Sequence, residues 1–384
     1  MNFEFATANR IKFGAGVINT LGAEAAQLGK RTLLVLNCPG ADSSKVKNLL
    51  DLSGIEHFAI EVCGEPTIDL VDRGLEKARS EKCDLVISFG GGSAIDTGKA
   101  IAVMMANPGE LMDYLEIVGK GQSLKMRAKP FIAIPTTAGT GSEVTKNAVI
   151  AVPDKQLKVS LRSSFMLPSL AIVDPELTCT LPPSVTASTG MDALTQVIEP
   201  FVSKKANGMV DMFCREGITR AARSLRQAFM KGSDIQARED MAMTSLLGGL
   251  SLANAGLGAV HGFAAPIGGM FKAPHGAVCA QLLTRVVSMN VKALKEREPA
   301  NPVLQRYKEI AQILTGDSKA SIGDGIKWLE NLCNFMVIPA LSSYGITCDD
   351  LPVLVDRSAA ASSMQANPLP LTKIEMMQIL EQAL

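Results

Sequence analysis

The first 180 residues alternate short apolar runs with segments of helical spacing. Five runs have the length and composition of buried strands, namely residues 32–37, 57–62, 84–90, 130–136 and 170–174. The segments 42–53 and 68–82, which lie between such runs, have helical periodicity. Strand–helix alternation is typical of a mostly parallel sheet covered by helices. We therefore predict an α/β domain over residues 1–180, with a β-hairpin over residues 148–161 inserted into it.

Beyond the segment TLPPS (180–184) the pattern changes to helices alone. Seven segments have helical periodicity: residues 184–203, 208–230, 236–257, 279–297, 301–315, 321–333 and 372–383. A chain with 47% hydrophobic residues can bury a large core, and 384 residues favour two domains. We predict a second, all-helical domain over residues 181–384.

The run 241–271 contains no Asp, Glu, Lys or Arg and is long enough to span a bilayer. Asn254, His261, Pro266 and several glycines interrupt it. We predict a buried helix to about residue 257 followed by a buried loop, and no membrane association.

Charge and cysteine content exclude several classes of protein. Lys+Arg and Asp+Glu both number 38, and aromatic residues make up 4% of the chain, so we expect no nucleic-acid partner. The eight cysteines are scattered without a C-x-x-C pair, which argues against a cysteine-type zinc site and indicates reduced thiols in the cytoplasm. The N-terminal segment lacks the pattern of a signal peptide.

A glycine-rich turn, ISFGGGSAIDTGKAIA (87–102), leads from a strand into a helix. We expect Ser93 to cap this helix, with Asp96 in a capping-box position. Gly91 and Gly92 let the backbone approach a ligand, and free N–H groups at a helix N-terminus favour phosphate oxygens. A tight turn without a ligand is the alternative, and for this motif alone we would favour it.

A second segment, IPTTAGTGSEVT (134–145), follows the next strand and supports a nucleotide at this edge of the sheet. Loops at the carboxyl ends of parallel strands are where dinucleotides bind in Rossmann-like domains. We expect side-chain hydroxyl groups of this segment to contact the cofactor. The candidates are Thr136, Thr137, Thr140 and Thr145.

Two of the chain's three histidines, His261 and His275, are each followed by glycine in the apolar segment AVHGFAAPIGGMFKAPHG (259–276). Asp192 and Gln196 are four residues apart in SVTASTGMDALTQVIEPFVS (184–203), and therefore lie on one face of the predicted helix. An Asp, two His and one more donor can hold a divalent transition metal. Asp192 alone would be an ordinary helix residue, but together with both histidines it favours a metal site.

Taken together, these motifs resemble those of the iron-containing (group III) alcohol dehydrogenases. DPELTCTLPPS (174–184) and NPLPLTKIEMMQIL (367–380) add to the resemblance, which covers essentially the whole chain. The resemblance implies a dinucleotide-binding domain, a helical domain, NAD(P) as hydride carrier and a divalent metal, Fe²⁺ or Zn²⁺, held by one Asp and three His. Carried over by position, Asp192, His261 and His275 match three of the ligands. The implied reaction is metal-dependent hydride transfer between NAD(P) and a small alcohol or aldehyde, and we expect a homodimer.

The sequence departs from the family pattern at two positions. Gln196 stands where the family has a histidine ligand, and it is the fourth candidate metal ligand through its amide oxygen. An amide oxygen binds metal less strongly than imidazole, so we expect weaker metal retention. Ala265 replaces a second histidine that often follows in the family, so a proton relay through position 265 is absent. We interpret the cysteines as packing residues.

The sequence leaves open the preference between NAD and NADP, the role of Lys158 and two alternative functions. Asn37 aligns with a frequent family Asp that binds the adenosine ribose, so we expect NAD to be preferred and NADP tolerated. Lys158 matches a family position near the cofactor, although a solvated hairpin lysine fits the sequence equally well. Two other functions stay open: a lyase like dehydroquinate synthase, which needs Lys and Arg around an acidic substrate, and a non-catalytic nucleotide-binding protein whose metal site has decayed.

Overall fold

The computed structural model describes residues 2–38 and 42–384. Residue 1 and residues 39–41 lie outside the described residues.

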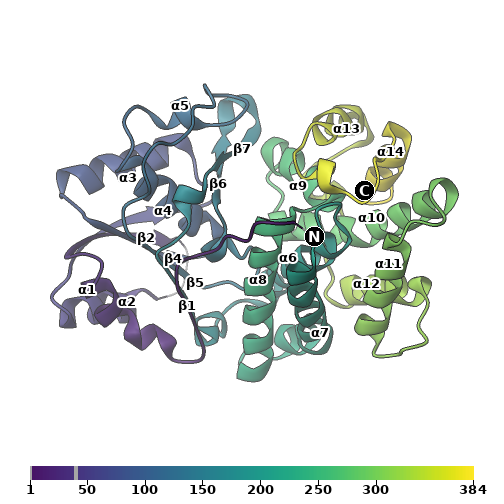
Figure 1. Ribbon diagram of the computed structural model, residues 1–384, viewed down its shortest axis with the longest axis horizontal. Coiled ribbons are helices and arrows are strands. Elements are labelled where there is room, and N and C mark those ends of the chain that lie inside the picture. The colour runs from purple at the N-terminus through teal and green to yellow at the C-terminus, as the bar shows by residue number, and fades with distance from the viewer. Residues whose placement is uncertain (1, 39–41) are drawn as a thin grey trace. The chain divides into compact units, whose positions relative to one another are not determined.

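The chain forms two compact units, which Figure 1 distinguishes by colour, purple to teal for one and green to yellow for most of the other. The α/β unit consists of residues 6–137 and 141–180. The helical unit consists of the residues up to Phe5, Ala138–Thr140 and Leu181–Leu384.

The described residues of the α/β unit contain a six-stranded sheet in the order β1-β8-β5-β4-β2-β3, with every pair parallel. Its strands are β1 (Ile11–Phe13), β2 (Arg31–Asn37), β3 (Glu56–Val62), β4 (Leu85–Gly90), β5 (Phe131–Pro135) and β8 (Leu170–Val173). The predicted parallel sheet is confirmed. β1 was not predicted, because three residues are too few for a recognisable apolar run.

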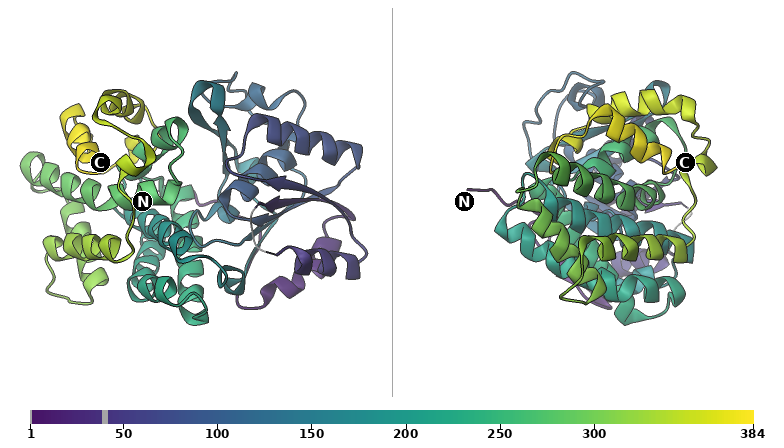
Figure 2. Two further views of the ribbon diagram at one scale, coloured as in Figure 1. Left: turned by 180° about the vertical axis from the view of Figure 1, so that it is seen from behind. Right: turned by 90° about the vertical axis from the view of Figure 1, so that its right-hand side faces the viewer.

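Alternate residues of each strand point to opposite sides of the sheet, so both faces carry apolar side chains. Helices cover both of these faces. Leu34 and Leu36 pack with the helices of one face, whereas Leu33 and Val35 pack with those of the other. Figure 2 shows the sheet between these two layers. The first layer holds α1 (Leu21–Ala26) and α2 (Ser44–Leu52), and the second holds α3 (Ile68–Ser80), α4 (Gly92–Met104) and α5 (Leu111–Tyr114).

The predicted hairpin is confirmed as β6 (Asn147–Val152) and β7 (Leu157–Arg162), which pair in antiparallel fashion. Their apolar residues pack in the same core as α3 and α4. The hairpin therefore rests on the helix that follows the glycine-rich turn.

The helical unit surrounds one large apolar core. Its central helix, α6, packs against α7, α8 and α10, and begins at Pro183, where the lost N–H of proline costs nothing. The helices are α6 (Pro183–Val202), α7 (Gly208–Met230), α8 (Ile235–Ala255), α9 (Ala259–Met270), α10 (His275–Arg297), α11 (Val303–Thr315), α12 (Ile322–Phe335), α13 (Leu351–Ala359) and α14 (Lys373–Glu381).

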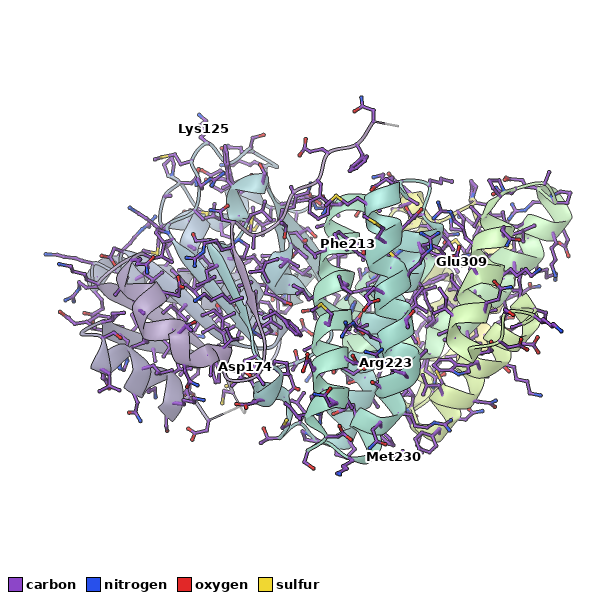
Figure 3. The ribbon with its side chains drawn as sticks, turned by 60° about the horizontal axis from the view of Figure 1, so that its bottom comes forward. Lys125, Asp174, Phe213, Arg223, Met230 and Glu309 are labelled. Carbon is purple, nitrogen blue, oxygen red and sulfur yellow. The ribbon has the colours of Figure 1, made fainter. Side chains whose placement is uncertain are left out.

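Side-chain caps and ion pairs with Asp240 hold α7 and α8 together. The Asn207 and Asp234 side chains accept hydrogen bonds from the first turns of α7 and α8, respectively. Figure 3 labels Arg223 on α7; its Nε donates to Asp240 of α8 over 2.6 Å. The long α7–α8 contact is thereby held in one register beside α6.

The predicted loop after residue 257 is wrong, because residues 259–270 form the helix α9. Glycine and proline disfavour helix in isolation, but this segment is buried among α10 and α13, and burial outweighs intrinsic preference. Among the described residues no single helix has the length and apolarity to cross a membrane. Only α8 and α9 taken together have the required length and apolarity, and a 99° bend separates these two helices.

Candidate functional site

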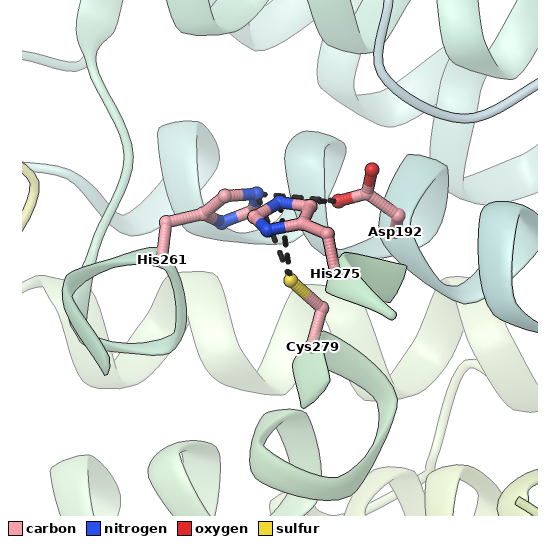
Figure 4. A group of neighbouring side chains, drawn as sticks. All are labelled: Asp192, His261, His275 and Cys279. Carbon is pink, nitrogen blue, oxygen red and sulfur yellow. Dashed lines mark hydrogen bonds and ion pairs between the residues drawn. The ribbon is translucent and has the colours of Figure 1, made fainter. Parts of the chain in front are cut away.

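Four side chains from three helices of the helical unit converge on one point. They are Asp192 on α6, His261 on α9, and His275 and Cys279 on α10, here called the donor cluster. Each contributes one metal-binding type of atom, and the four atoms lie within 4.8 Å of one another. Figure 4 shows both imidazole rings directed at the carboxylate of Asp192 and the sulfur of Cys279.

The distances within the donor cluster are short. The Oδ1 atom of Asp192 lies 3.2 Å from Nε2 of His261 and 3.8 Å from Nε2 of His275. The structure thus brings together Asp192, His261 and His275, which the sequence predicts as partners across more than 80 positions.

Cys279 completes the donor cluster: it packs in the apolar core, as predicted, and in addition its sulfur lies beside both histidines, which the sequence did not reveal. Its Sγ atom lies 3.7 Å from Nε2 of His275 and 3.9 Å from Nε2 of His261. The signal in the sequence was the spacing of four residues between His275 and Cys279, which places both side chains on one face of a helix.

The donor cluster brings two acidic groups and two imidazoles together in a largely buried site. Asp192 and Cys279 are buried, whereas 36% of the His275 side chain is exposed. Burial would raise the pKa of Asp192, but the neighbouring positive histidines outweigh it and hold this pKa below its ordinary value. Burial would likewise raise the pKa of the Cys279 thiol, and His275 and His261 lower it overall. The donor cluster therefore favours the ionised, metal-binding forms of both acids.

Glu199 contacts the His261 ring on the nitrogen that faces away from the donor cluster, and it was not recognised from the sequence. Its Oε2 lies 2.6 Å from Nδ1 of His261, and its Oε1 accepts the backbone N–H of Val260 over 2.7 Å. A carboxylate on the far nitrogen orients a ligating histidine and fixes its tautomer. The seven-residue spacing from Asp192 on α6 was the available signal, since residues seven apart share a helix face.

Gln196 lies one turn after Asp192 on α6 and is buried. A hydrogen bond from its side chain to Asp192 contributes to the lowered pKa of that carboxyl. Within the described residues its Oε1 atom has no hydrogen-bond partner. Ala265, one turn after His261 on α9, offers no ionisable group near these residues.

The glycine-rich turn lies in the α/β unit, at the carboxyl end of β4. A Cβ atom added at Gly91 would lie 3.3 Å from Oγ1 of Thr137, and one added at Gly90 would lie 2.8 Å from Cβ of Asn37. The structure therefore brings Asn37 and Thr137 to this turn from the ends of the two neighbouring strands.

The predicted cap by Ser93 is wrong. Helix α4 begins at Gly92 with Gly91 in the cap position, and among the described residues the cap makes no side-chain hydrogen bond to the first turn. Ser93 lies inside that first turn, so its backbone N–H is one of those that have no partner within the helix. The backbone at Gly92 and Ser93 can therefore serve a ligand without displacing a cap.

Asp96 takes no part in a capping box, because its side chain faces the hairpin instead. Its Oδ2 accepts the backbone N–H of Val149 over 2.9 Å, and its Oδ1 lies 3.1 Å from Nζ of Lys99. Lys99, which was not singled out in the sequence, also donates to Oγ1 of Thr145 over 2.9 Å. Asp96 and Thr145 thus brace the hairpin against α4.

The remaining predicted cofactor residues are dispersed. Thr136 is buried and its backbone N–H donates to the carbonyl of Gly90 over 3.0 Å. Thr140 belongs to the helical unit. Lys158 forms an ion pair with Glu65 over 2.8 Å, and only 8% of its side chain is exposed, unlike a solvated hairpin lysine.

Comparison with known proteins places the chain in a family. Residues 8–175 match the model of the iron-containing alcohol dehydrogenases, and residues 186–384 match that of the family's C-terminal domain. The alcohol dehydrogenase 4 of Schizosaccharomyces pombe is 35% identical, and the alignment covers 97% of this chain and 87% of the relative. The NAD-dependent methanol dehydrogenase of Bacillus methanolicus is 32% identical, with 97% of each chain covered.

The crystal structure of a 1,3-propanediol oxidoreductase superimposes over the full length of both chains, with a TM-score of 0.93 and 33% identity. The comparisons do not favour the lyase or the non-catalytic alternative. The chain belongs to the iron-containing alcohol dehydrogenase family, and it is an NAD-linked, metal-dependent oxidoreductase of alcohols and aldehydes.

Proposed function

We propose that this enzyme holds a divalent metal through Asp192, His261 and His275 and transfers a hydride between a small alcohol or aldehyde and C4 of a nicotinamide. The observation that carries the proposal is the convergence of one carboxylate and two imidazoles in a buried place. The proposal depends on these three ligands and does not require Gln196, whose amide oxygen is a weaker donor than imidazole for borderline metals.

The spacing of the donor cluster fits a single metal ion. Ligand atoms at about 2.0–2.3 Å from a tetrahedral metal lie roughly 3.3–3.8 Å from one another. The Oδ1 atom of Asp192 lies 3.2 and 3.8 Å from the two histidine Nε2 atoms. Small adjustments of side chains would therefore suffice for binding.

Each residue of the site has a definable task in this proposal. A divalent metal supplies Lewis-acid chemistry, which lowers the pKa of an alcohol or polarises a carbonyl. Glu199 holds Nδ1 of His261, so that Nε2 stays directed at the donor cluster. The half-exposed His275 marks the side open to substrate, whereas burial of Asp192 keeps water from its carboxylate. Ala265 cannot carry a proton, so the proton leaves through water or a ribose hydroxyl.

The cofactor phosphates bind at Gly91, Gly92 and Ser93 in this proposal, because the first N–H groups of α4 attract anions. NAD is preferred and NADP tolerated, since Asn37 can hydrogen-bond a ribose but lacks the charge that repels a 2′-phosphate. Asp96, Thr136, Thr137, Thr140, Thr145 and Lys158 are proposed to shape or contact the cofactor site.

We further propose that the enzyme works in the cytoplasm as a homodimer, with Fe²⁺ or Zn²⁺ as its metal. All eight cysteines are free thiols, as expected in a reducing compartment.

The proposal is tested by reconstituting chelator-treated protein with Fe²⁺ or Zn²⁺ and screening small aldehydes and alcohols with both cofactors. We expect turnover only after metal is restored, and higher kcat/KM with NADH than with NADPH. Equal turnover by the metal-free protein, or none by fully metal-loaded protein on any compound, would overturn it.

A further inference from the structure

We propose that Cys279 is the fourth protein ligand of the metal, in the place that the sequence assigns to Gln196, and that its thiolate directs the site toward Zn²⁺. This inference rests on the proposed metal site and adds a ligand of different chemistry to it. It makes the first coordination shell one carboxylate, two imidazoles and one sulfur.

Geometry supports Cys279 as a ligand. For a zinc–sulfur bond of about 2.3 Å and zinc–nitrogen bonds of about 2.0 Å, the sulfur and nitrogen atoms lie roughly 3.5 Å apart in a tetrahedral site. The Sγ atom lies 3.7 and 3.9 Å from the two Nε2 atoms, within a few tenths of an ångström of that distance. Cys279 therefore stands where a fourth ligand belongs.

The backbone makes this position robust. His275 is the first residue of α10 and Cys279 follows one turn later, so the helix itself fixes the distance between imidazole and sulfur. Cys279 is fully buried. Cys279 packs in the apolar core, and its sulfur is also within 4 Å of two imidazole nitrogens, which packing alone does not require.

Gln196 has a different relation to the site. It lies one turn after Asp192 on α6, and in this proposal its amide orients that carboxylate. Its unpartnered Oε1 is the observation in favour of a ligand role, and the experiment below therefore includes it.

A thiolate changes which metal the site retains. Soft sulfur ligands favour zinc, whereas oxygen and imidazole ligands alone also suit iron. Binding converts the Cys279 thiol to a thiolate and releases its proton to solvent, so one bond to metal replaces one S–H bond. With four protein ligands, zinc held here would take the substrate oxygen as a fifth ligand, an expansion that some catalytic zinc sites undergo.

The test is titration of chelator-treated, otherwise intact protein with Co²⁺, followed by absorption spectroscopy. We expect one equivalent to bind, with visible bands of a low-coordinate ion and a near-ultraviolet sulfur-to-cobalt charge-transfer band. Cys279→Ser should abolish the near-ultraviolet band and weaken Zn²⁺ at least tenfold in chelator competition, with a smaller loss for Fe²⁺.

Cys214→Ser is the matched control, because Cys214 is also fully buried in the helical unit but contacts Ser251 instead of a histidine. It should keep the charge-transfer band and the Zn²⁺ affinity. Gln196→Ala should keep the band with a smaller loss of affinity.

The outcomes separate this inference from the proposed function. Stoichiometric Co²⁺ without the charge-transfer band, or a band that survives in Cys279→Ser, would overturn the sulfur ligand and leave the three-ligand site standing. A larger loss in Gln196→Ala than in Cys279→Ser would assign the fourth position to Gln196. No Co²⁺ binding at all would overturn the metal site itself.

Discussion

The donor cluster of the helical unit and the glycine-rich turn of the α/β unit are built on opposite principles. The donor cluster takes side chains from α6, α9 and α10, which are far apart in the sequence. The turn offers backbone N–H groups from consecutive residues, Gly91 to Ser93. A site made of side chains is lost when one of them is removed, whereas a site made of backbone is sensitive mainly to steric bulk.

The two units also treat a buried carboxyl group differently. Asp192 lies beside two histidines, which hold its pKa below the ordinary value despite burial. Glu143, in a short 3-10 helix after β5, is equally buried. Burial raises its pKa to about 7, because a backbone hydrogen bond and the attraction of Lys99 offset desolvation only in part. The first arrangement favours a bound cation, and the second favours a neutral acid.

The largest expected effect comes from His275→Ala. Loss of this imidazole ligand should reduce bound metal to a trace and lower turnover by more than about 100-fold, because even outer-sphere changes cost 10–100-fold. Metal analysis and kinetics measure both, and NAD binding followed by fluorescence should remain unchanged. Stoichiometric metal with full turnover in this variant would contradict the assigned site.

Glu143→Gln should stabilise the protein at high pH alone. A carboxyl whose pKa is raised in the folded state adds no penalty below its unfolded value of 4.5. The penalty grows as pH rises from 4.5 to about 7, and above that it stays constant at roughly 3 kcal/mol. Urea unfolding should show the variant more stable at pH 8 and equal to the wild type near pH 4.5. Glu76→Gln, at an exposed position of α3, is the control and should show no such pH-dependent gain in stability. A gain in the stability of Glu143→Gln that does not depend on pH would refute the account.

Gly92→Val should affect the cofactor and spare the metal. A branched side chain at the start of α4 would crowd the phosphates, and the loss of one charge-assisted hydrogen bond corresponds to a rise of about tenfold in the KM for NAD. Gly323→Val serves as control, because Gly323 is in the first turn of α12 and a Cβ atom there would make only an ordinary contact, at 3.6 Å from Oγ of Ser321. Unchanged cofactor binding in Gly92→Val would show that the turn is only structural.

The smallest expected effect is that of Asn37→Asp at the end of β2. The added negative charge should repel a 2′-phosphate and raise the NAD/NADP ratio of kcat/KM several-fold. Steady-state kinetics with both cofactors measures that ratio. A strong preference of the wild type for NADP, or an unaltered ratio in the variant, would count against the proposed ribose contact.

The sequence predicted the parallel sheet, the hairpin and most helices, because apolar periodicity is a local property. It could not predict α9, whose glycines and proline adopt a helix only under burial by distant segments. It also missed Cys279 for a local reason. The predicted helix began at residue 279, whereas α10 begins at His275, so the two residues were not recognised as neighbours on one face.

The most direct test of the metal site is a crystal structure of zinc-loaded protein with anomalous data collected at the zinc edge. The account predicts one strong anomalous peak, at about 2.0–2.2 Å from Oδ1 of Asp192 and from Nε2 of His261 and His275. A competing place exists in the α/β unit, where Cys38, Glu61 and Cys63 form a more exposed group of donors. An anomalous peak there, with none at Asp192 and the two histidines in active protein, would contradict the account.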